Sequence, residues 1–270
     1  MSASIPDPQQ RLRAAEEIAA NSGLMRLEPQ STQPNSLPVA AWIRHPPNKN
    51  VAASSLHIYI EGDGLGWQSR RRVSLDPTPL HPTAMELAAA DPSRATIVYL
   101  GRPCQYGFRQ DSACRPIFWT AARHGEAVID AMDRRIDALI TELDTRDPLT
   151  LIGYSGGGVV AALLAARRND IELLVTIAAP LDLDEWTRAA HVSPLAASLS
   201  PMNELEALRS IRQHHFVGRD DARVPIAATE SFHRELGRDA PSRLTIVEGM
   251  DHRSWPEAWK TLIETNGLFE

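Results

Sequence analysis

The sequence alternates short apolar runs with longer segments in which apolar residues recur at helical spacing. Several runs are apolar on both faces, as in strands of a parallel sheet that helices cover on each side. The runs are residues 39–43, 56–60, 96–100, 149–154, 173–178, 215–217 and 244–247. The predicted helices are residues 82–90, 120–143, 157–168, 224–236 and 256–265. Strands that alternate with helices predict an α/β fold with a mostly parallel, doubly wound sheet and helices on both faces.

The same pattern predicts a single α/β domain over residues 38–270. Residues 1–37 are expected to be peripheral, with a helix from about Gln10 to Asn21 that ends at Gly23 and a linker rich in Pro, Ser and Gln after it. Residues 182–204 contain Ser, Pro and two short apolar patches, and we expect a short excursion between two strands there.

Composition and charge give no sign of nucleic-acid binding, a metal site or a membrane span. The chain has 270 residues and a net charge of −6, which gives no reason to expect nucleic acid as a partner. The nine histidines show no metal-ligand spacing, so we expect no metal. No stretch approaches the roughly 18 to 20 apolar residues of a membrane-spanning helix. No signal peptide is visible either, because charged residues stand where its apolar region would be.

The two cysteines, Cys104 and Cys114, allow two interpretations. They are either free thiols of a cytoplasmic protein or a disulfide that holds the segment between them, which would imply export. The second interpretation requires that a signal peptide has been removed.

The segment from Leu149 to Leu164 has the order strand, sharp turn and helix, and its turn reads G-x-S-x-G around Ser155. A serine on such a turn stands exposed at the carboxyl edge of the sheet, and strand and helix approach so closely that small residues must flank it. The next N–H group, that of Gly156, begins a helix whose positive end favours an oxyanion. Ser155 is therefore the candidate nucleophile.

The same glycines support two other hypotheses. Gly156, Gly158 and Ala161 fit G-x-G-x-x-A, a pattern typical of dinucleotide binding. A glycine-rich turn that only packs tightly would look the same. Neither of these hypotheses uses the acidic residues and the histidine farther along the chain.

A serine nucleophile needs a histidine to take its proton and a carboxylate to orient that histidine. The run 215–217 is followed by Asp220 and Asp221, and the run 244–247 is followed by Asp251 and His252. Both pairs thus stand just past the carboxyl ends of strands, at the edge where Ser155 emerges. A turn or cap role remains open for either aspartate, and a helix-capping role for His252.

The combination GYSGG, VGRDDARVP and GMDH resembles the α/β-hydrolase superfamily over residues 38–270. The resemblance implies the triad Ser155, Asp221 and His252. Asp221 is chosen over Asp220 because the family's acid stands three residues before the valine of the turn, and the choice between the neighbours stays open.

The resemblance also implies an oxyanion hole. The loop after the run 56–60 often begins His-Gly in the family, whereas this chain has Glu61 and Gly62. By position, Asp63 supplies a backbone N–H beside that of Gly156. The Asp63 carboxylate must then turn away or meet a cation. The arginine run 70–72 is either a solvated surface or lies near the mouth of the site, where it would pair with Asp63 and Glu61 or hold an anionic substrate. Glu61, Gly62, Tyr106 and Trp119 are candidate pocket residues.

The E-G-D-G loop, R-P-C-x-Y and the second cysteine resemble a group of bacterial α/β hydrolases, many of them exported or lipid-anchored. The implied protein is a serine hydrolase, carboxylesterase-like, that cleaves an ester or related acyl bond of a small molecule without any cofactor. Thioesterase, peptidase and acyltransferase variants use the same parts. The alternatives are a non-catalytic binding protein on this fold and an NAD(P)-binding oxidoreductase. Location is periplasm or envelope if the disulfide forms and a signal was trimmed, and otherwise cytoplasm; the oligomeric state is not predicted.

Overall fold

The computed structural model describes residues 5–28, 36–46 and 55–269, and the predicted linker lies largely outside them. Over these residues the chain forms an eight-stranded sheet in the order β1-β2-β6-β3-β7-β8-β9-β10 and a separate hairpin, β4-β5. The strands are β1 (Met25–Arg26), β2 (Ala41–Arg44), β3 (Leu56–Ile60), β4 (Trp67–Ser69), β5 (Arg72–Val73), β6 (Thr96–Leu100), β7 (Leu149–Tyr154), β8 (Ile171–Ile177), β9 (Arg212–Gly218) and β10 (Ser242–Val247).

The sheet from β6 to β10 is parallel, and β1 and β2 run antiparallel at one edge. The mostly parallel, doubly wound fold predicted from the sequence is confirmed. The helices are α1 (Pro8–Ser22), α2 (Thr83–Ala90), α3 (Glu126–Leu143), α4 (Gly156–Arg167), α5 (Leu183–Ala189), α6 (Leu205–Leu208), α7 (Ile226–Leu236) and α8 (Trp255–Asn266). Three short 3₁₀ helices, Phe108–Gln110, Pro116–Trp119 and Pro201–Asn203, lie in the loops.

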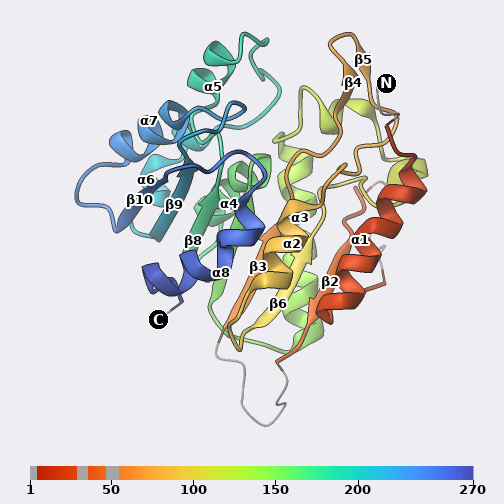
Figure 1. Cartoon of the computed structure of the whole chain (residues 1–270), viewed down its shortest axis with the longest axis horizontal. Helices are drawn as coiled ribbons and strands as arrows, with labels where there is room; N and C mark the ends of the chain where they lie inside the picture. The colour runs from red at the N-terminus through yellow and green to blue at the C-terminus, as the bar shows by residue number, and fades with distance from the viewer. Residues whose placement is uncertain (1–4, 29–35, 47–54, 270) are drawn as a thin grey trace.

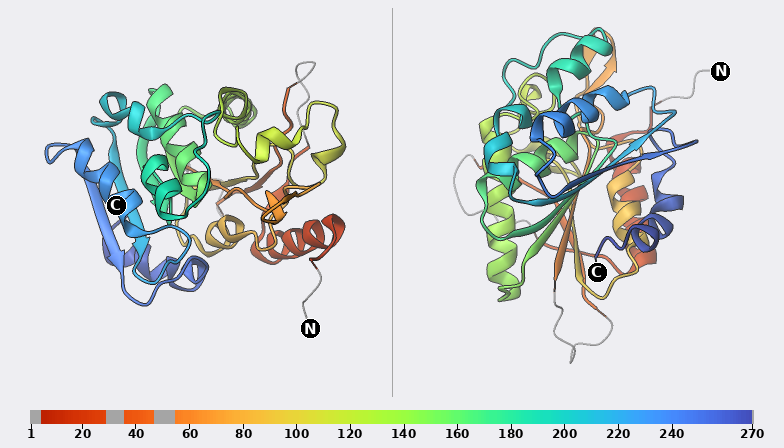
Figure 2. Two further views of the ribbon diagram at one scale, coloured as in Figure 1. Left: turned by 90° about the horizontal axis from the view of Figure 1, so that it is seen from above. Right: turned by 90° about the vertical axis from the view of Figure 1, so that its left-hand side faces the viewer.

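Helices cover both faces of the sheet (Figures 1 and 2), with α1, α2 and α8 on one face and α3, α4 and α7 on the other. Every residue of strand β3 is buried, and its histidine, His57, is hydrogen-bonded to Asp91 at 2.9 Å. Ile58 packs into the core under α3 and α4, and Tyr59 into the core under α2 and α8. Side chains that alternate between two covered faces are all buried, so no position of the strand faces water as in a half-exposed strand.

Strand register brings the ends of distant segments together. Ile60, the last residue of β3, pairs with Leu100 of β6 and Gly153 of β7. On the other side of β7, Gly218 of β9 pairs with Val247 of β10. Since the carboxyl ends of parallel strands meet at one edge, the loops after all five strands open at the same edge of the sheet. The α5 helix and the β4-β5 hairpin also project at one end of the molecule (Figure 1).

The amino-terminal segment packs onto this domain. Asp7 caps α1, accepting a hydrogen bond from the Gln10 backbone N–H at 2.8 Å while the Gln10 side chain accepts one from the Asp7 N–H. Gly23 ends the helix with φ of 74°, the left-handed conformation that glycine adopts without strain. Ala15 and Ala19 are buried against the domain, and β1 adds an edge strand. The division at residue 37 stays a prediction.

The helix predicted over residues 120–143 begins later, and this part of the prediction is wrong. The α3 helix starts at Glu126, with Gly125 as its N-cap residue in an extended conformation. A β carbon on Gly125 would lie 2.8 Å from the Ala197 carbonyl oxygen, so no other residue fits there. Residues 120–125 therefore form a loop that leads toward the carboxyl edge of the sheet.

The loops after β6 carry a disulfide between Cys104 and Cys114. Of the two interpretations of these cysteines, the structure has the disulfide, and an oxidising location of the protein stays a prediction. Within the described part of the chain, no helix is long and apolar enough to cross a bilayer.

Candidate active site

Ser155 lies in a strained backbone conformation between β7 and α4. Its φ of 52° and ψ of −125° lie outside the regions that side chains other than glycine prefer. The turn closes tightly around it, because a β carbon on Gly153 would lie 2.3 Å from the Gly157 carbonyl oxygen. One on Gly157 would lie 2.2 Å from the Ile60 carbonyl oxygen. The flanking glycines thus let strand and helix approach closely enough to hold Ser155 at the sheet edge.

The loop after β3 borders Ser155. A β carbon built on Gly62 would lie 3.4 Å from the Ser155 β carbon, and one on Gly156 would lie 2.0 Å from Asp63 Oδ1. Gly62, Asp63 and the first residue of α4 therefore surround the serine. A larger residue at Gly156 would collide with the Asp63 carboxylate.

His252 and Asp221 form a hydrogen-bonded pair. The distance from His252 Nδ1 to Asp221 Oδ2 is 2.7 Å, and the Asp221 side chain is fully buried. The other carboxylate oxygen accepts the backbone N–H groups of Arg223 and Val224 at 2.8 and 2.9 Å. The Tyr154 hydroxyl donates to the His252 carbonyl oxygen at 2.6 Å. These contacts fix the histidine loop and its carboxylate partner together.

Asp220 and Asp251, the neighbours of this pair in the chain, have other surroundings. Asp220 is exposed. Asp251 is exposed as well, and its Oδ1 accepts the backbone N–H groups of Arg253 and Ser254 ahead of α8. Of the three aspartates that follow β9 and β10 in the predicted site, Asp221 is the one that contacts the His252 ring.

Asp63 meets two arginines. Its Oδ1 lies 3.1 Å from an Arg102 terminal nitrogen and its Oδ2 lies 3.0 Å from one of Arg123. Its Oδ1 also lies 3.3 Å from His124 Nε2. Burial alone would raise the pKa of the Asp63 carboxyl, but the charges of Arg123, His124 and Arg102 hold it well below its usual range. Asp63 is therefore an ionised carboxylate whose charge is offset.

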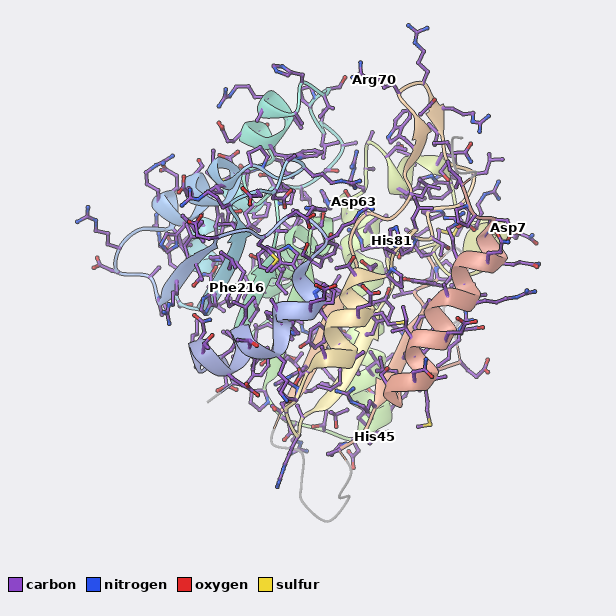
Figure 3. The ribbon with its side chains drawn as sticks, in the orientation of Figure 1. Asp7, His45, Asp63, Arg70, His81 and Phe216 are labelled. Atoms are coloured by element: carbon purple, nitrogen blue, oxygen red, sulfur yellow. A yellow bond between two sulfur atoms is a disulfide. The ribbon has the colours of Figure 1, made fainter. Side chains whose placement is uncertain are left out.

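The cations come from segments other than the one considered from the sequence. The arginine run 70–72 lies on the β4-β5 hairpin, and Arg70 points away from the molecule (Figure 3). Arg123 and His124 stand in the loop that was predicted as helix. The signal was available in Gly125, which ends that loop, because a glycine there is a poor helix-interior residue.

Glu61 is buried behind the same loop. One carboxyl oxygen accepts the backbone N–H of Gly62 at 2.8 Å, and the other accepts the Ala84 N–H at 3.2 Å and the Tyr99 hydroxyl at 3.0 Å. Tyr99 is in turn hydrogen-bonded to Tyr106. Burial raises the pKa of Glu61 to about 7, against these hydrogen bonds, which lower it. Glu61 thus fastens the loop to the start of α2.

These residues open onto one cavity of about 390 Å³. Its wall includes Glu61, Gly62, Asp63, Trp67, His81, Arg123, His124, Tyr154, Ser155, Gly156, Trp186, Arg223, His252 and Arg253. Of the four candidate pocket residues, the structure puts Glu61 and Gly62 on this wall. It buries Tyr106 and Trp119 in the core instead, where the Tyr106 ring packs edge-to-face with Trp42 and the Trp119 indole donates to the Ser74 carbonyl.

Solved structures share this architecture. Acylaminoacyl peptidase of Pyrococcus horikoshii superposes with a TM-score of 0.65 and 12% identity, over 90% of this chain and 41% of the peptidase. An esterase of Pyrococcus furiosus gives 0.62 and 13%, over 92% and 91% of the two chains. A lidless α/β serine hydrolase of Xanthomonas campestris gives 0.57 and 15%, over 92% and 96%. This chain has the α/β-hydrolase fold. No protein-family model and no curated protein matches its sequence.

A metal ion or a nucleotide would each require features of its own at this site. The described residues contain no cluster of three or more His, Cys, Asp or Glu side chains suited to a metal. At the amino end of α4, where a dinucleotide would place its pyrophosphate, the ionised Asp63 carboxylate lies against Gly156. The carboxylate fills the space that the pyrophosphate would need, so the glycine pattern does not fit a dinucleotide here.

Replacing Glu61 by glutamine should remove one part of the pH dependence of stability. A buried Glu61 with a pKa near 7 keeps its proton in the folded protein at pH values where the unfolded chain, with a pKa of 4.5, has lost it. The contribution of Glu61 to stability is therefore full below pH 4.5 and falls as pH rises to 7. The total fall is on the order of 3 kcal/mol.

The measurement is urea unfolding of wild type and Glu61→Gln between pH 4.5 and 8. Burial lowers the pKa of His124 and His214 to about 4 and that of His215 to about 3, so these histidines titrate in the opposite sense over the same range. For that reason the difference between the two proteins is compared rather than either curve. A difference that stays constant with pH would contradict the buried, protonated Glu61.

Proposed function

We propose that this protein is a serine hydrolase that cleaves an ester or related acyl bond through an acyl-enzyme intermediate. One observation carries the proposal. A serine in a strained strand-to-helix turn and a histidine bound to a buried carboxylate share the wall of one cavity. A merely structural turn would not require that histidine, nor would a nucleotide site.

In the proposed reaction, the Ser155 Oγ attacks the acyl carbon while His252 takes its proton. Asp221 holds the imidazole through the Nδ1 hydrogen bond and stabilises the positive charge that forms on it. As the bond to the leaving oxygen breaks, His252 returns the proton to that oxygen and the alcohol departs. Water then attacks the acyl-enzyme with His252 again as the base, which releases the acid and restores Ser155.

The backbone N–H groups of Gly156 and Asp63 are the proposed oxyanion donors. Gly156 begins α4, whose amino end favours negative charge, and the Asp63 loop borders Ser155. Arg102 and Arg123 offset the Asp63 carboxylate, so it does not oppose the developing oxyanion. Glu61 anchors the next residue, Gly62, to α2.

We propose a carboxylesterase as the reaction type. Two structural neighbours that this chain matches over about nine-tenths of both lengths are described as an esterase and as a lidless serine hydrolase. The chain spans only 41% of the peptidase's length, so peptide hydrolysis has less support. A thioesterase or acyltransferase would use the same residues. A non-catalytic binding protein on this fold is the opposing candidate.

The test is covalent labelling with a fluorophosphonate probe, which reacts with activated serines. We expect one adduct per chain, mapped by peptide mass spectrometry to Ser155, and hydrolysis of short-chain 4-nitrophenyl esters by the same preparation. Comparing the hydrolysis rates of a thioester and an amide of the same acyl group with that of the ester distinguishes an esterase from a thioesterase and from an amidase. A protein that is folded by circular dichroism but takes no label and hydrolyses none of these would favour the binding protein.

A further inference from the structure

Two arginines on the cavity wall have no partner of their own. Arg223 follows Asp221 by two residues and Arg253 follows His252 directly, and both are exposed at the cavity. Within the described residues, neither guanidinium forms a hydrogen bond or an ion pair, although the Asp251 carboxylate is close enough to feel the Arg253 charge. The positive charges at this side of the mouth are therefore available to a ligand.

The other charges of the cavity are already offset. Asp63 is paired with Arg102 and Arg123. Glu61 is buried, and both its oxygens accept hydrogen bonds. Asp221 is bound to His252. The surplus at the mouth is thus positive, in a chain whose net charge is −6.

Both arginines act on the same part of the cavity. His81 also lines it, and after burial the charges of Arg253 and Arg223 are what lower the pKa of the His81 ring. Figure 3 shows His81 near Asp63 in the middle of the molecule, below the gap between α5 and the β4-β5 hairpin. Arg223 and Arg253 therefore line one cavity from two different loops, and both are near enough to His81 for their charges to act on it.

The part of the cavity that Arg223 and Arg253 line is the leaving-group side of the site. His252 returns its proton to the leaving oxygen, so the leaving group must lie against the His252 loop, whereas the acyl oxygen faces Gly156 and Asp63. Arg253 is next to His252 in the chain, and Arg223 belongs to the loop that holds Asp221. This assignment rests on the proposed function.

We propose that Arg223 and Arg253 select esters whose alcohol part carries a carboxylate. A guanidinium binds a carboxylate through paired N–H donors, and two of them at an open mouth would also steer an anion toward the site.

The test compares substrates that differ only in this charge. 4-Acetoxybenzoate has an anionic leaving group and its methyl ester a neutral one, with the same acetyl group. The selectivity is the ratio of their kcat/KM values, corrected for their uncatalysed hydrolysis rates. Mono-4-nitrophenyl glutarate and its methyl ester carry the same difference on the acyl side. We expect wild type to prefer the anion in the first pair, mainly through KM, and less so at high salt.

The variants are Arg223→Gln, Arg253→Gln and the double variant, with Arg219→Gln as the matched control. Arg219 lies in the same loop as Arg223 but is bound to Glu248. The double variant should lower the leaving-group selectivity about tenfold, as two exposed charge contacts would, and the control should keep it. An unchanged selectivity in the double variant would overturn the proposal, as would a preference for the anion confined to the acyl-side pair.

Binding provides a second readout that does not depend on turnover. Calorimetry on Ser155→Ala measures the Kd of 4-acetoxybenzoate and of its methyl ester, with and without the two arginine substitutions. If 4-acetoxybenzoate binds more tightly than its methyl ester and this difference disappears when the two arginines are replaced, the proposal is supported. That result would hold even if no hydrolysis were observed, because absence of hydrolysis contradicts the proposed function and not the role of the arginines. Equal binding of acid and methyl ester overturns it.

Discussion

Replacing Ser155 by alanine should lower kcat/KM for a short-chain 4-nitrophenyl ester by about three orders of magnitude or more. The reason is that the alanine side chain has no oxygen to form the acyl-enzyme. The strained backbone at this position suits alanine no worse than serine, since both carry a β carbon. The measurement is initial-rate kinetics on protein whose circular dichroism spectrum and melting temperature match those of wild type.

His252→Ala should cost a similar factor, and the double variant should cost no more than either single one. Residues that act as one unit lose their common effect together, so their effects do not add. Fluorophosphonate labelling should also be lost in His252→Ala although Ser155 is present, because the hydroxyl is no longer activated. Additive losses, or a Ser155→Ala protein that keeps its rate, would assign the chemistry to other residues.

The second large effect is expected for Asp221→Asn, which should lower kcat by about 10³ to 10⁴-fold. An amide in place of the carboxylate removes the charge that stabilises the imidazolium and offers an N–H to His252 Nδ1, which favours the wrong tautomer. The amide oxygen can still accept the N–H groups of Arg223 and Val224, so the loop should keep its shape. The measurement is the kcat of the variant across pH.

Asp220→Asn is the matched control, because it makes the same chemical change one residue earlier in the chain. Asp220 is exposed, and its substitution should leave kcat within about twofold of wild type, as surface substitutions usually do. If the large loss appeared in Asp220→Asn and not in Asp221→Asn, the assignment of the triad acid would be reversed.

The strands near the site were predictable, and their burial explains why. The bounds of β3, β6 and β7 coincide with the runs at 56–60, 96–100 and 149–154, because central strands covered on both faces are buried at every position and no exposed position interrupts the run. The turn around Ser155 was predictable for another reason. Its three flanking glycines, Gly153, Gly156 and Gly157, are required because a β carbon on each would make a contact of 2.0 to 2.3 Å.

The cations around Asp63 were not predictable from local patterns. Gly125 marks the helix start after Arg123 and His124. No local pattern shows that these two side chains meet Asp63, which lies 60 residues before Arg123 in the chain. Tyr106 likewise follows a strand on the correct edge, but its ring turns into the core toward Trp42. The direction in which a loop side chain points depends on tertiary packing, and the spacing of residues in the sequence does not give that packing.

The Cys104–Cys114 bond restrains the loop that carries Arg102, two residues before the first cysteine. A loop closed by a covalent link samples fewer conformations than an open one, so the guanidinium visits fewer positions away from Asp63. The Arg102 charge that offsets Asp63, beside the proposed nucleophile Ser155, is therefore kept in place by a bond outside the cavity. In kinetic terms, we expect the crosslink to shorten the time during which the Asp63 carboxylate lacks the Arg102 charge. It does so without occupying any part of the cavity wall.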